Sequence, residues 1–419
     1  MSLSSNFPAI RPSLLLDFQK SRAVDPRITF TRASTATYFD EDGILQSALA
    51  NVPRIDFNPS TLVCNGLLIE EQRTNSIRNN TMQGAVAGSP GTLPTNWTYL
   101  EAGSELAAAV VGTGTESGIT YIDLKVSGTV TAQRSALIFF ESSTATSASQ
   151  SWTESLYLKL QAGSTANIEQ INIRTDYYNS TPTFISSTVG AALTVTTTAL
   201  NTQRQSNSVT TPASTAFIQP MLRVRSNASG AIDITLRIGL PQLELGAFAT
   251  SVIPTTTTAL TRNADVASMT GTNFSDWYNA SEGTVVIDCP ANSSNVSITA
   301  LTISDGTNSN RIFIGAGANN AAWNPFLVTS GTSQGSLSTG SSYPPQTNPR
   351  LAVAYKTDDS AACVSGVAPV VDTTVNLPVV NRMNIGASGV GTVGLNGTIR
   401  RIAYYPTRLP NTTLQALTG

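Results

Sequence analysis

One stretch, Arg237–Asp265, constrains the architecture of this chain more than any other. Just before and into it, apolar residues alternate with polar ones through Ile232, Ile234, Leu236 and Ile238, the period of a half-buried strand. Pro241 has no backbone N–H, so we expect this strand to end there or to lie at a sheet edge. Four threonines follow Pro254 in a polar, β-branched run that disfavours a helix. The stretch therefore reads as the last strand of one β-sandwich and the connector into a second.

Length and charge then set limits on the class of protein. A chain of 419 residues is too long for one core and predicts about two or three domains. Charged residues make up only 12%, a composition that suits extracellular or virion β-proteins with uncharged polar faces. The formal net charge of −2 provides no long-range attraction for nucleic acid or for an anionic membrane. We expect neither nucleic-acid binding nor membrane insertion.

Cysteine and histidine restrict the chemistry. Cys64, Cys289 and Cys363 are far apart and form no CxxC pair, so we expect three small buried side chains and no zinc site. The chain has no histidine, which excludes Ser-His or Cys-His nucleophiles and His-ligated metals. The acidic segment 40–42 before Gly43 lacks the distant bidentate Glu of a calcium loop, and we interpret it as a hairpin turn. No metal and no cofactor is predicted.

The strand pattern divides the chain into four parts. Residues 1–78 form an N-terminal arm of short strands, and 79–255 a first sandwich. Residues 256–280 form a linker with a short helix at 274–279, and 281–419 a second sandwich that ends in a helix at 412–417, capped by Asn411. The predicted fold class is all-β: two tandem β-sandwich or jelly-roll domains preceded by an anchoring arm.

Three groups of motifs resemble known protein modules. The arm contains LDFQKSRAVDPRITFTRASTATYFDEDGILQSALANVPRIDFNPS and GLLIEEQRTNSI, and it resembles a module of tailed-bacteriophage virion proteins. The first sandwich resembles carbohydrate-binding-module-like domains through NNTMQGAVAGSPGTLPTNWTY, LRIGLPQLELGAFATSVIPT and LTRNADVASM. The second is similar to laminin-G or concanavalin A-like lectin jelly rolls through LAVAYKTDDSAACVSGVAPVV, RMNIGAS and LNGTIRRIAYYPTRLPNTTLQALT.

The resemblance implies a phage structural or adhesion protein of the tail-fibre or head-decoration type, with no catalytic residues to transfer. It implies attachment to other virion proteins through residues 1–78, where Leu14, Leu15, Leu16 and Phe18 are expected to be exposed. It also implies a homo-oligomer, most simply a homotrimer, and contact with host-surface glycans. The beginning of the chain shows no signal-peptide pattern, so we expect synthesis in a host bacterial cytoplasm and a final location in the virion.

A sugar site should contain an aromatic ring that stacks on a pyranose, with amides beside it for the hydroxyls. Trp323 is the best candidate because Asn319, Asn320 and Asn324 surround it on an expected loop. The alternative is a tryptophan that packs at a sandwich edge. Trp97 and Trp152 fall in strand patterns and are expected in a core, and Trp277 is expected to fill the domain junction. The pair Tyr177–Tyr178 before Asn179 is a weaker loop candidate.

An enzyme is not predicted. A retaining glycosidase on a jelly roll needs two carboxylates about 5 Å apart on one face, and Gln242-Leu243-Glu244 supplies only one. Two alternatives to a glycan-binding virion protein stay open at this point: a purely architectural capsid or tail cement protein, and a polysaccharide-degrading enzyme.

Overall fold

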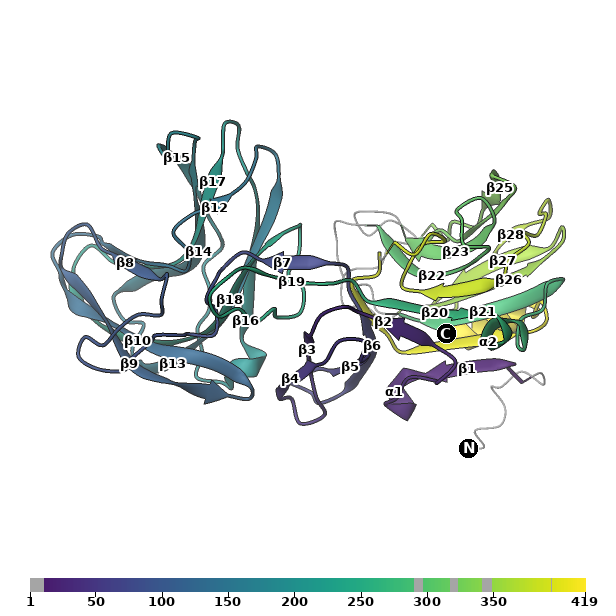
Figure 1. Cartoon of the computed structure of the whole chain (residues 1–419), viewed down its shortest axis with the longest axis horizontal. Coiled ribbons are helices and arrows are strands. Elements are labelled where there is room, and N and C mark those ends of the chain that lie inside the picture. The colour runs from purple at the N-terminus through teal and green to yellow at the C-terminus, as the bar shows by residue number, and fades with distance from the viewer. Residues whose placement is uncertain (1–10, 290–296, 317–322, 341–348, 393) are drawn as a thin grey trace.

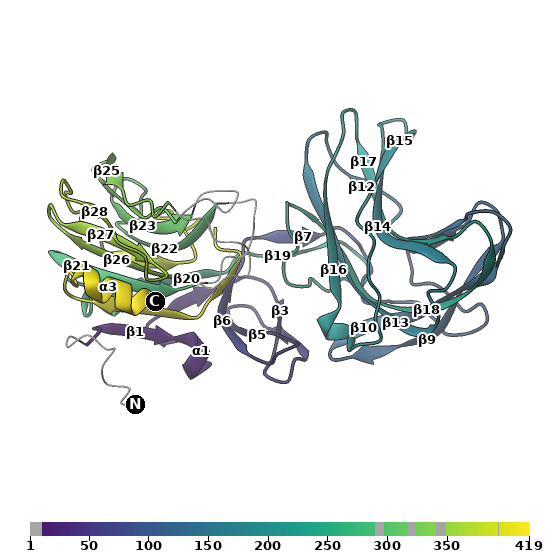
Figure 2. The same ribbon diagram turned by 180° about the vertical axis from the view of Figure 1, so that it is seen from behind.

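The computed structural model describes residues 11–289, 297–316, 323–340, 349–392 and 394–419. The regular structure of these residues is almost entirely antiparallel β, which confirms the predicted all-β class. Two sandwich lobes lie side by side along the long axis, and the hairpins β3–β6 lie between them (Figure 1). The view from behind shows the same two lobes and the helix α3 on the outside of the C-terminal one (Figure 2).

The first lobe, here called the middle sandwich, has one sheet with the order β16-β13-β18-β10-β9. Its second sheet has the order β15-β14-β17-β11-β8, with β12 beside β17. The strands and a short 3-10 helix η2 have these bounds: β8 Thr98–Leu100, β9 Leu106–Glu116, β10 Ile119–Val130, β11 Ser135–Phe139, β12 Thr144–Ala145, β13 Ser151–Gly163, β14 Ile168–Tyr178, β15 Phe184–Val189, η2 Leu200–Thr202, β16 Arg204–Thr210, β17 Phe217–Ser226 and β18 Gly230–Leu245. The alternating residues of these strands meet between the sheets in one apolar core.

Strand β18 does not end at Pro241, contrary to the sequence-based expectation. It continues to Leu245 and stays paired with β13, whereas its pairing with β10 stops at Gly239. The β13 register shifts across Leu240 and Pro241, and Leu240 has a φ of 43°. Pro241 thus occupies an irregular position beyond the β10 ladder, where the absence of an N–H removes no hydrogen bond to β10.

The second lobe, here called the C-terminal sandwich, combines a sheet of order β1-β31-β21-β26-β27-β28 with one of order β2-β20-β29-β22-β23-β24-β25. Its strands have these bounds: β1 Leu14–Asp17, β2 Thr29–Thr31, β20 Val266–Thr270, β21 Glu282–Asp288, β22 Ile298–Ser304, β23 Arg311–Ala316, β24 Phe326–Thr329, β25 Thr332–Ser336, β26 Arg350–Lys356, β27 Ser360–Val364, β28 Val370–Asp372, β29 Arg382–Ile385 and β31 Arg401–Tyr405.

The expected exposure of Leu14, Leu16 and Phe18 is wrong, because residues 14–31 of the predicted arm belong to the C-terminal sandwich. Leu14 pairs with Tyr404 in β31, and Thr29 pairs with Ser268 in β20. Leu14, Leu16 and Phe18 are 1%, 2% and 1% exposed in the core of that sandwich, and only Leu15 among the four apolar residues is exposed. The middle sandwich is therefore inserted between early and late strands of the C-terminal one.

Smaller elements connect the two lobes. The three-stranded sheet of the described residues has the order β30-β6-β5, the hairpin strands β3 and β4 pair with each other, and β7 pairs with the distant strand β19. Their bounds are β3 Ala36–Phe39, β4 Leu45–Ala48, β5 Arg54–Phe57, β6 Cys64–Ile69, β7 Arg73–Asn75, β19 Leu260–Arg262 and β30 Gly397–Ile399. Gly43 has a φ of 70° in the β3–β4 turn, which confirms the predicted hairpin.

The helices are short: α1 Phe18–Ser21, α2 Thr272–Ser275 and α3 Asn411–Thr418. Helix α3 buries Leu414 and Leu417 against the outer side of β26 and β27. It begins one residue earlier than expected, so Pro410 holds the N-cap position and the predicted Asn411 cap is wrong. The predicted burial of the three cysteine side chains is confirmed.

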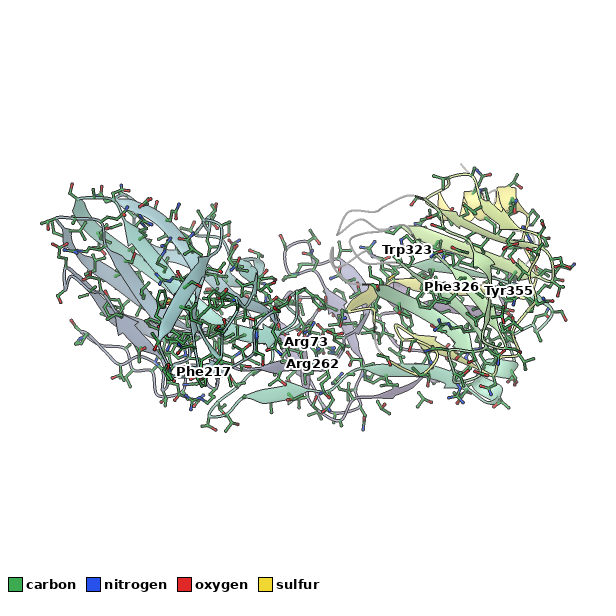
Figure 3. All side chains as sticks on the ribbon, turned by 90° about the horizontal axis from the view of Figure 1, so that it is seen from above. Arg73, Phe217, Arg262, Trp323, Phe326 and Tyr355 are labelled. Atoms are coloured by element: carbon green, nitrogen blue, oxygen red, sulfur yellow. The ribbon has the colours of Figure 1, made fainter. Side chains whose placement is uncertain are left out.

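A buried ion network lies between the lobes, and Figure 3 shows Arg262 beside Arg73 in this region. Asp265 contacts Arg32 at 2.9 Å and Arg54 at 2.5 Å, and Glu70 contacts Arg54 at 2.9 Å and Arg262 at 2.8 Å. All five side chains are nearly inaccessible to solvent. The two arginines Arg262 and Arg54 hold the pKa of Glu70 at about 2, although burial opposes this. This junction network joins the arm to the connector between the sandwiches.

Candidate functional site

Trp323, which was predicted to stack on a sugar ring, is not accessible to a ligand. Its side chain is 2% exposed and packs in the core of the C-terminal sandwich, visible in Figure 3. A backbone bridge to Ala316 and hydrogen bonds from Thr339 to its carbonyl oxygen hold the residue against β23. Asn324 donates its N–H to the Gly315 oxygen at 2.9 Å. The burial of Trp323 agrees with the alternative that this tryptophan is a packing residue. The other two predicted site residues, Asn319 and Asn320, lie outside the described residues.

The other aromatic expectations have mixed outcomes. Trp97 and Trp152 are 5% and 6% exposed in the core of the middle sandwich, as expected. Trp277 is buried, but it packs on Tyr404 within the C-terminal sandwich instead of filling the junction between the sandwiches. Tyr177 and Tyr178 end strand β14 and are not on a loop. Tyr177 faces the core, and its hydroxyl is 2.8 Å from that of Thr188.

The C-terminal sandwich has a groove of about 690 Å³ beside α2, which we call the α2 groove. Its apolar side chains are Phe274, Tyr278, Ala280 and Val380. Phe274 stacks on Tyr278 with ring centroids 4.7 Å apart, and Tyr278 stacks in turn towards Tyr355 at 6.5 Å. The groove is therefore built on a fixed aromatic cluster that belongs to the core.

The rim of the α2 groove is polar and without acidic groups. It consists of hydroxyl, amide and guanidinium side chains: Thr270, Thr272, Ser275, Asn381 and Arg382. Arg382 donates from Nε to the Asn381 amide oxygen at 3.1 Å and forms no ion pair with any described residue. Gly271 has a φ of 58° and no atom within 4 Å of where a Cβ would be, so the backbone at this rim is open. The rim can donate and accept hydrogen bonds without competing negative charge.

Sequence reasoning missed this groove. It assembles residues 270–280 with 380–382, which become neighbours only because β20 pairs with β29. The one available signal was the predicted helix at 274–279, which contains Phe274 and Tyr278 and whose Trp277 was assigned to the domain junction. The observed helix α2 is shorter, and its last turn presents Ser275 to the groove.

A smaller cavity of about 210 Å³ lies at the junction between the lobes. Asp56, Tyr157 and Arg204 are among its lining residues. Burial raises the pKa of Asp56 to about 6, although it accepts hydrogen bonds from the Phe39 N–H and the Asn65 amide. Arg204 donates to Ser155 Oγ at 3.0 Å, while its buried Nε has no partner among the described residues. The cavity is polar but about one third the size of the α2 groove.

The described part of the chain contains no group of three or more Cys, Asp or Glu side chains placed to hold a metal ion. None of its helices has the length and apolar character needed to cross a membrane.

Comparisons with known proteins give partial structural likeness only. No protein-family model matches the chain, and no curated protein matches its sequence. The CBM40 of Ruminococcus gnavus IT-sialidase bound to α2,3-sialyllactose is 20% identical with a TM-score of 0.31, over 34% of this chain and 84% of that chain. The NanB sialidase of Streptococcus pneumoniae is 15% identical with a TM-score of 0.29, over 35% and 26%. Trypanosoma rangeli sialidase is 14% identical with a TM-score of 0.28, over 36% and 26%. At these scores the likeness carries no argument about function.

Proposed function

We propose that this protein is a non-enzymatic, glycan-binding structural protein of a phage virion, of the tail-fibre or head-decoration type. The observation that carries the binding part is the α2 groove, in which an apolar aromatic floor is bordered by neutral polar groups and by Arg382, which forms no ion pair with a described residue. A sugar has the matching chemistry, because its C–H faces are apolar and its hydroxyls exchange hydrogen bonds at the periphery.

The same lining favours binding over catalysis. Hydrolysis of a glycosidic bond generally uses two carboxyl groups on either side of that bond. The residues that line the α2 groove include neither Asp nor Glu. The groove therefore suits recognition of a glycan better than its degradation.

The virion part of the proposal rests on the sequence motifs of residues 16–60 and 66–77, which resemble phage structural modules. In this proposal, residues 1–78 contact other virion proteins, and the protein assembles as a homotrimer. Because β1 and β2 complete the C-terminal sandwich, such contacts would use exposed residues of this segment, such as Leu15 and Leu49.

A glycan array with full-length protein tests the binding proposal, with Arg382→Ala as the groove variant. Arg350→Ala is the matched control, because Arg350 is an exposed arginine of the same sandwich and does not line the groove. We expect binding to fall at least tenfold for Arg382→Ala and to be unchanged for the control. Absence of any glycan signal in the wild type would favour the architectural alternative. Shortened polysaccharide chains after incubation would favour the enzyme.

A further inference from the structure

The middle sandwich has a second surface with binding chemistry, on the outer side of β14 and β17. The register pairs Asn172 with Arg223, Arg174 with Met221, Asp176 with Gln219 and Tyr178 with Phe217. Paired residues of antiparallel strands point to the same side of a sheet. The alternate residues of both strands are in the sandwich core: Ile171, Ile173, Tyr177, Ile218, Leu222 and Val224. The first set therefore forms the outer side, which we call the β14–β17 face. Asn172, Asp176 and Met221 are nearly buried within it, and Arg174, Tyr178, Phe217 and Gln219 are partly exposed.

Two of the arginines on and beside this face have carboxylate partners. Arg174 donates from Nε and Nη2 to the two oxygens of Asp176, at 2.6 and 3.1 Å. Arg225 lies 3.0 Å from the Glu169 carboxylate. These two pairs balance their own charges.

Arg223 is different, because no carboxylate of the described residues forms an ion pair with it. Its Nη2 donates to the amide oxygens of Asn172 at 2.8 Å and of Gln170 at 3.3 Å, and both acceptors are neutral. Its Nε makes no hydrogen bond to any described residue, although Arg223 is only 7% exposed. Burial lowers the pKa of Arg223, and the positive charges of Arg225 and Arg174 lower it further. A cation held in this way costs folding free energy that an anionic ligand would offset.

The other end of the face is aromatic. Phe217 and Tyr178 pair across the strands, and Tyr178 is in edge contact with Phe184 at 5.8 Å. Phe184 is 51% exposed, and Figure 3 shows Phe217 on the middle sandwich, in the opposite lobe from Trp323. Six residues separate Phe217 from Arg223, which corresponds to about 20 Å along an extended strand. A ligand that uses both ends must therefore be elongated.

We infer that the β14–β17 face binds a linear, carboxylate-bearing oligosaccharide along the strand direction. One carboxylate approaches the Arg223 guanidinium and forms a charge-assisted contact with it. Sugar rings further along the chain lie against Tyr178, Phe217 and Phe184. This site is in the other sandwich from the α2 groove and does not depend on the proposed function of that groove.

Charge complementarity favours an acidic glycan over a nucleic acid. Three arginines, Arg174, Arg223 and Arg225, face two carboxylates, Asp176 and Glu169, so the surface has a surplus of one positive charge. A nucleic acid would bring a continuous row of phosphates and would need several unpaired cations. A sparsely charged polymer with apolar sugar faces fits this single surplus and the aromatic end.

Isothermal titration of the full-length protein with tetragalacturonate tests the inference, with maltotetraose as the neutral probe. We expect binding of the acidic probe alone, with affinity reduced at least tenfold in Arg223→Met and several-fold in Phe184→Ala. Arg22→Gln is the control for loss of one positive charge, because Arg22 is exposed on the arm. Arg382→Ala should leave this binding unchanged, which separates it from the α2 groove.

Several results would overturn the inference. These are no binding of tetragalacturonate, equal binding of maltotetraose, or unaltered affinity in Arg223→Met with the fold intact by circular dichroism. Tighter binding of a single-stranded DNA 12-mer would assign the face to nucleic acid instead. Self-association by light scattering that disappears in Arg223→Met would assign it to a second copy of the chain.

Discussion

This molecule contains two groups of three arginines that differ in their role. At the junction network, Arg32, Arg54 and Arg262 are each within 2.9 Å of a buried carboxylate. On the β14–β17 face, Arg223 has only neutral partners. Arg223 is nearly as buried as the three junction arginines, so burial does not distinguish it from them. The presence of a counter-ion does: a paired buried charge fixes structure, and an unpaired one leaves capacity for a ligand.

The largest expected effect comes from breaking the junction network. Arg54→Met removes the one arginine that contacts both Asp265 and Glu70 and leaves these carboxylates with too little compensation. We expect the free energy of unfolding to fall by about 3–5 kcal/mol, measured by urea denaturation. Lys125→Met is the control, since its ion pair with Asp233 is largely exposed, and should change stability by less than about 1 kcal/mol. A loss below that control value for Arg54→Met would refute the structural role.

Acid should weaken the junction network in a defined pH window. The pKa of Glu70 is lowered from 4.5 to about 2, so the ionised form is stabilised in the folded state. Its contribution is present above pH 4.5 and is lost as the pH falls towards 2, on the order of 3 kcal/mol in total. Denaturation at several pH values should show this slope in the wild type and a shallower one in Glu70→Gln. Equal slopes in the two proteins would contradict the assignment.

Glu154 is the reverse case of Arg223: a buried carboxylate that has no cationic partner among the described residues. Glu154 is 1% exposed and forms no ion pair with a described residue, and burial raises its pKa well above the usual value although the Met221 backbone opposes this. The folded state therefore prefers the protonated acid, and stability declines as the pH rises above about 4.5. Glu154→Gln should gain about 1–3 kcal/mol at pH 7 and almost nothing at pH 4. Glu169→Gln, at an exposed position, is the control for loss of a carboxylate.

The smallest effect is expected on the β14–β17 face. Arg223→Met makes the same change of residue type as Arg54→Met, but it leaves no carboxylate without its arginine partner. We expect stability within about 1 kcal/mol of the wild type, and on the stabilising side, because an unpaired buried charge is removed. A loss comparable to that of Arg54→Met would show that Arg223 is structural and that the comparison fails.

The sequence allowed the class of fold to be predicted because alternation is local. Ile232 to Ile238 indicate a strand without knowledge of its partners, and Gly43 indicates its turn. Pairings between distant residues had no such signal. Leu14 and Tyr404 become neighbours across almost the whole chain, so an apolar run that is buried in a sheet was interpreted as an exposed anchor.

The sites were less predictable than the fold for the same reason. Asparagines around Trp323 indicated a loop, but the bridge to Ala316 turns the ring into the core. The α2 groove depends on the pairing of β20 with β29, and the isolation of Arg223 depends on which side chains β14 places beside it. Residue types alone do not reveal whether an arginine will have a counter-ion.

The pairing of β1 with β31 also imposes an order on folding during synthesis. Strand β1 leaves the ribosome about 390 residues before the partner it must pair with. The middle sandwich is contiguous in sequence, so it can fold while the C-terminal strands are still being made. Until β31 has been synthesised, Leu14, Leu16 and Phe18 have no core in which to pack and remain exposed apolar surface on the nascent chain. Strand β1 therefore stays unpaired until β31 has been synthesised, and a binding partner or chaperone that shields β1 would act within that interval.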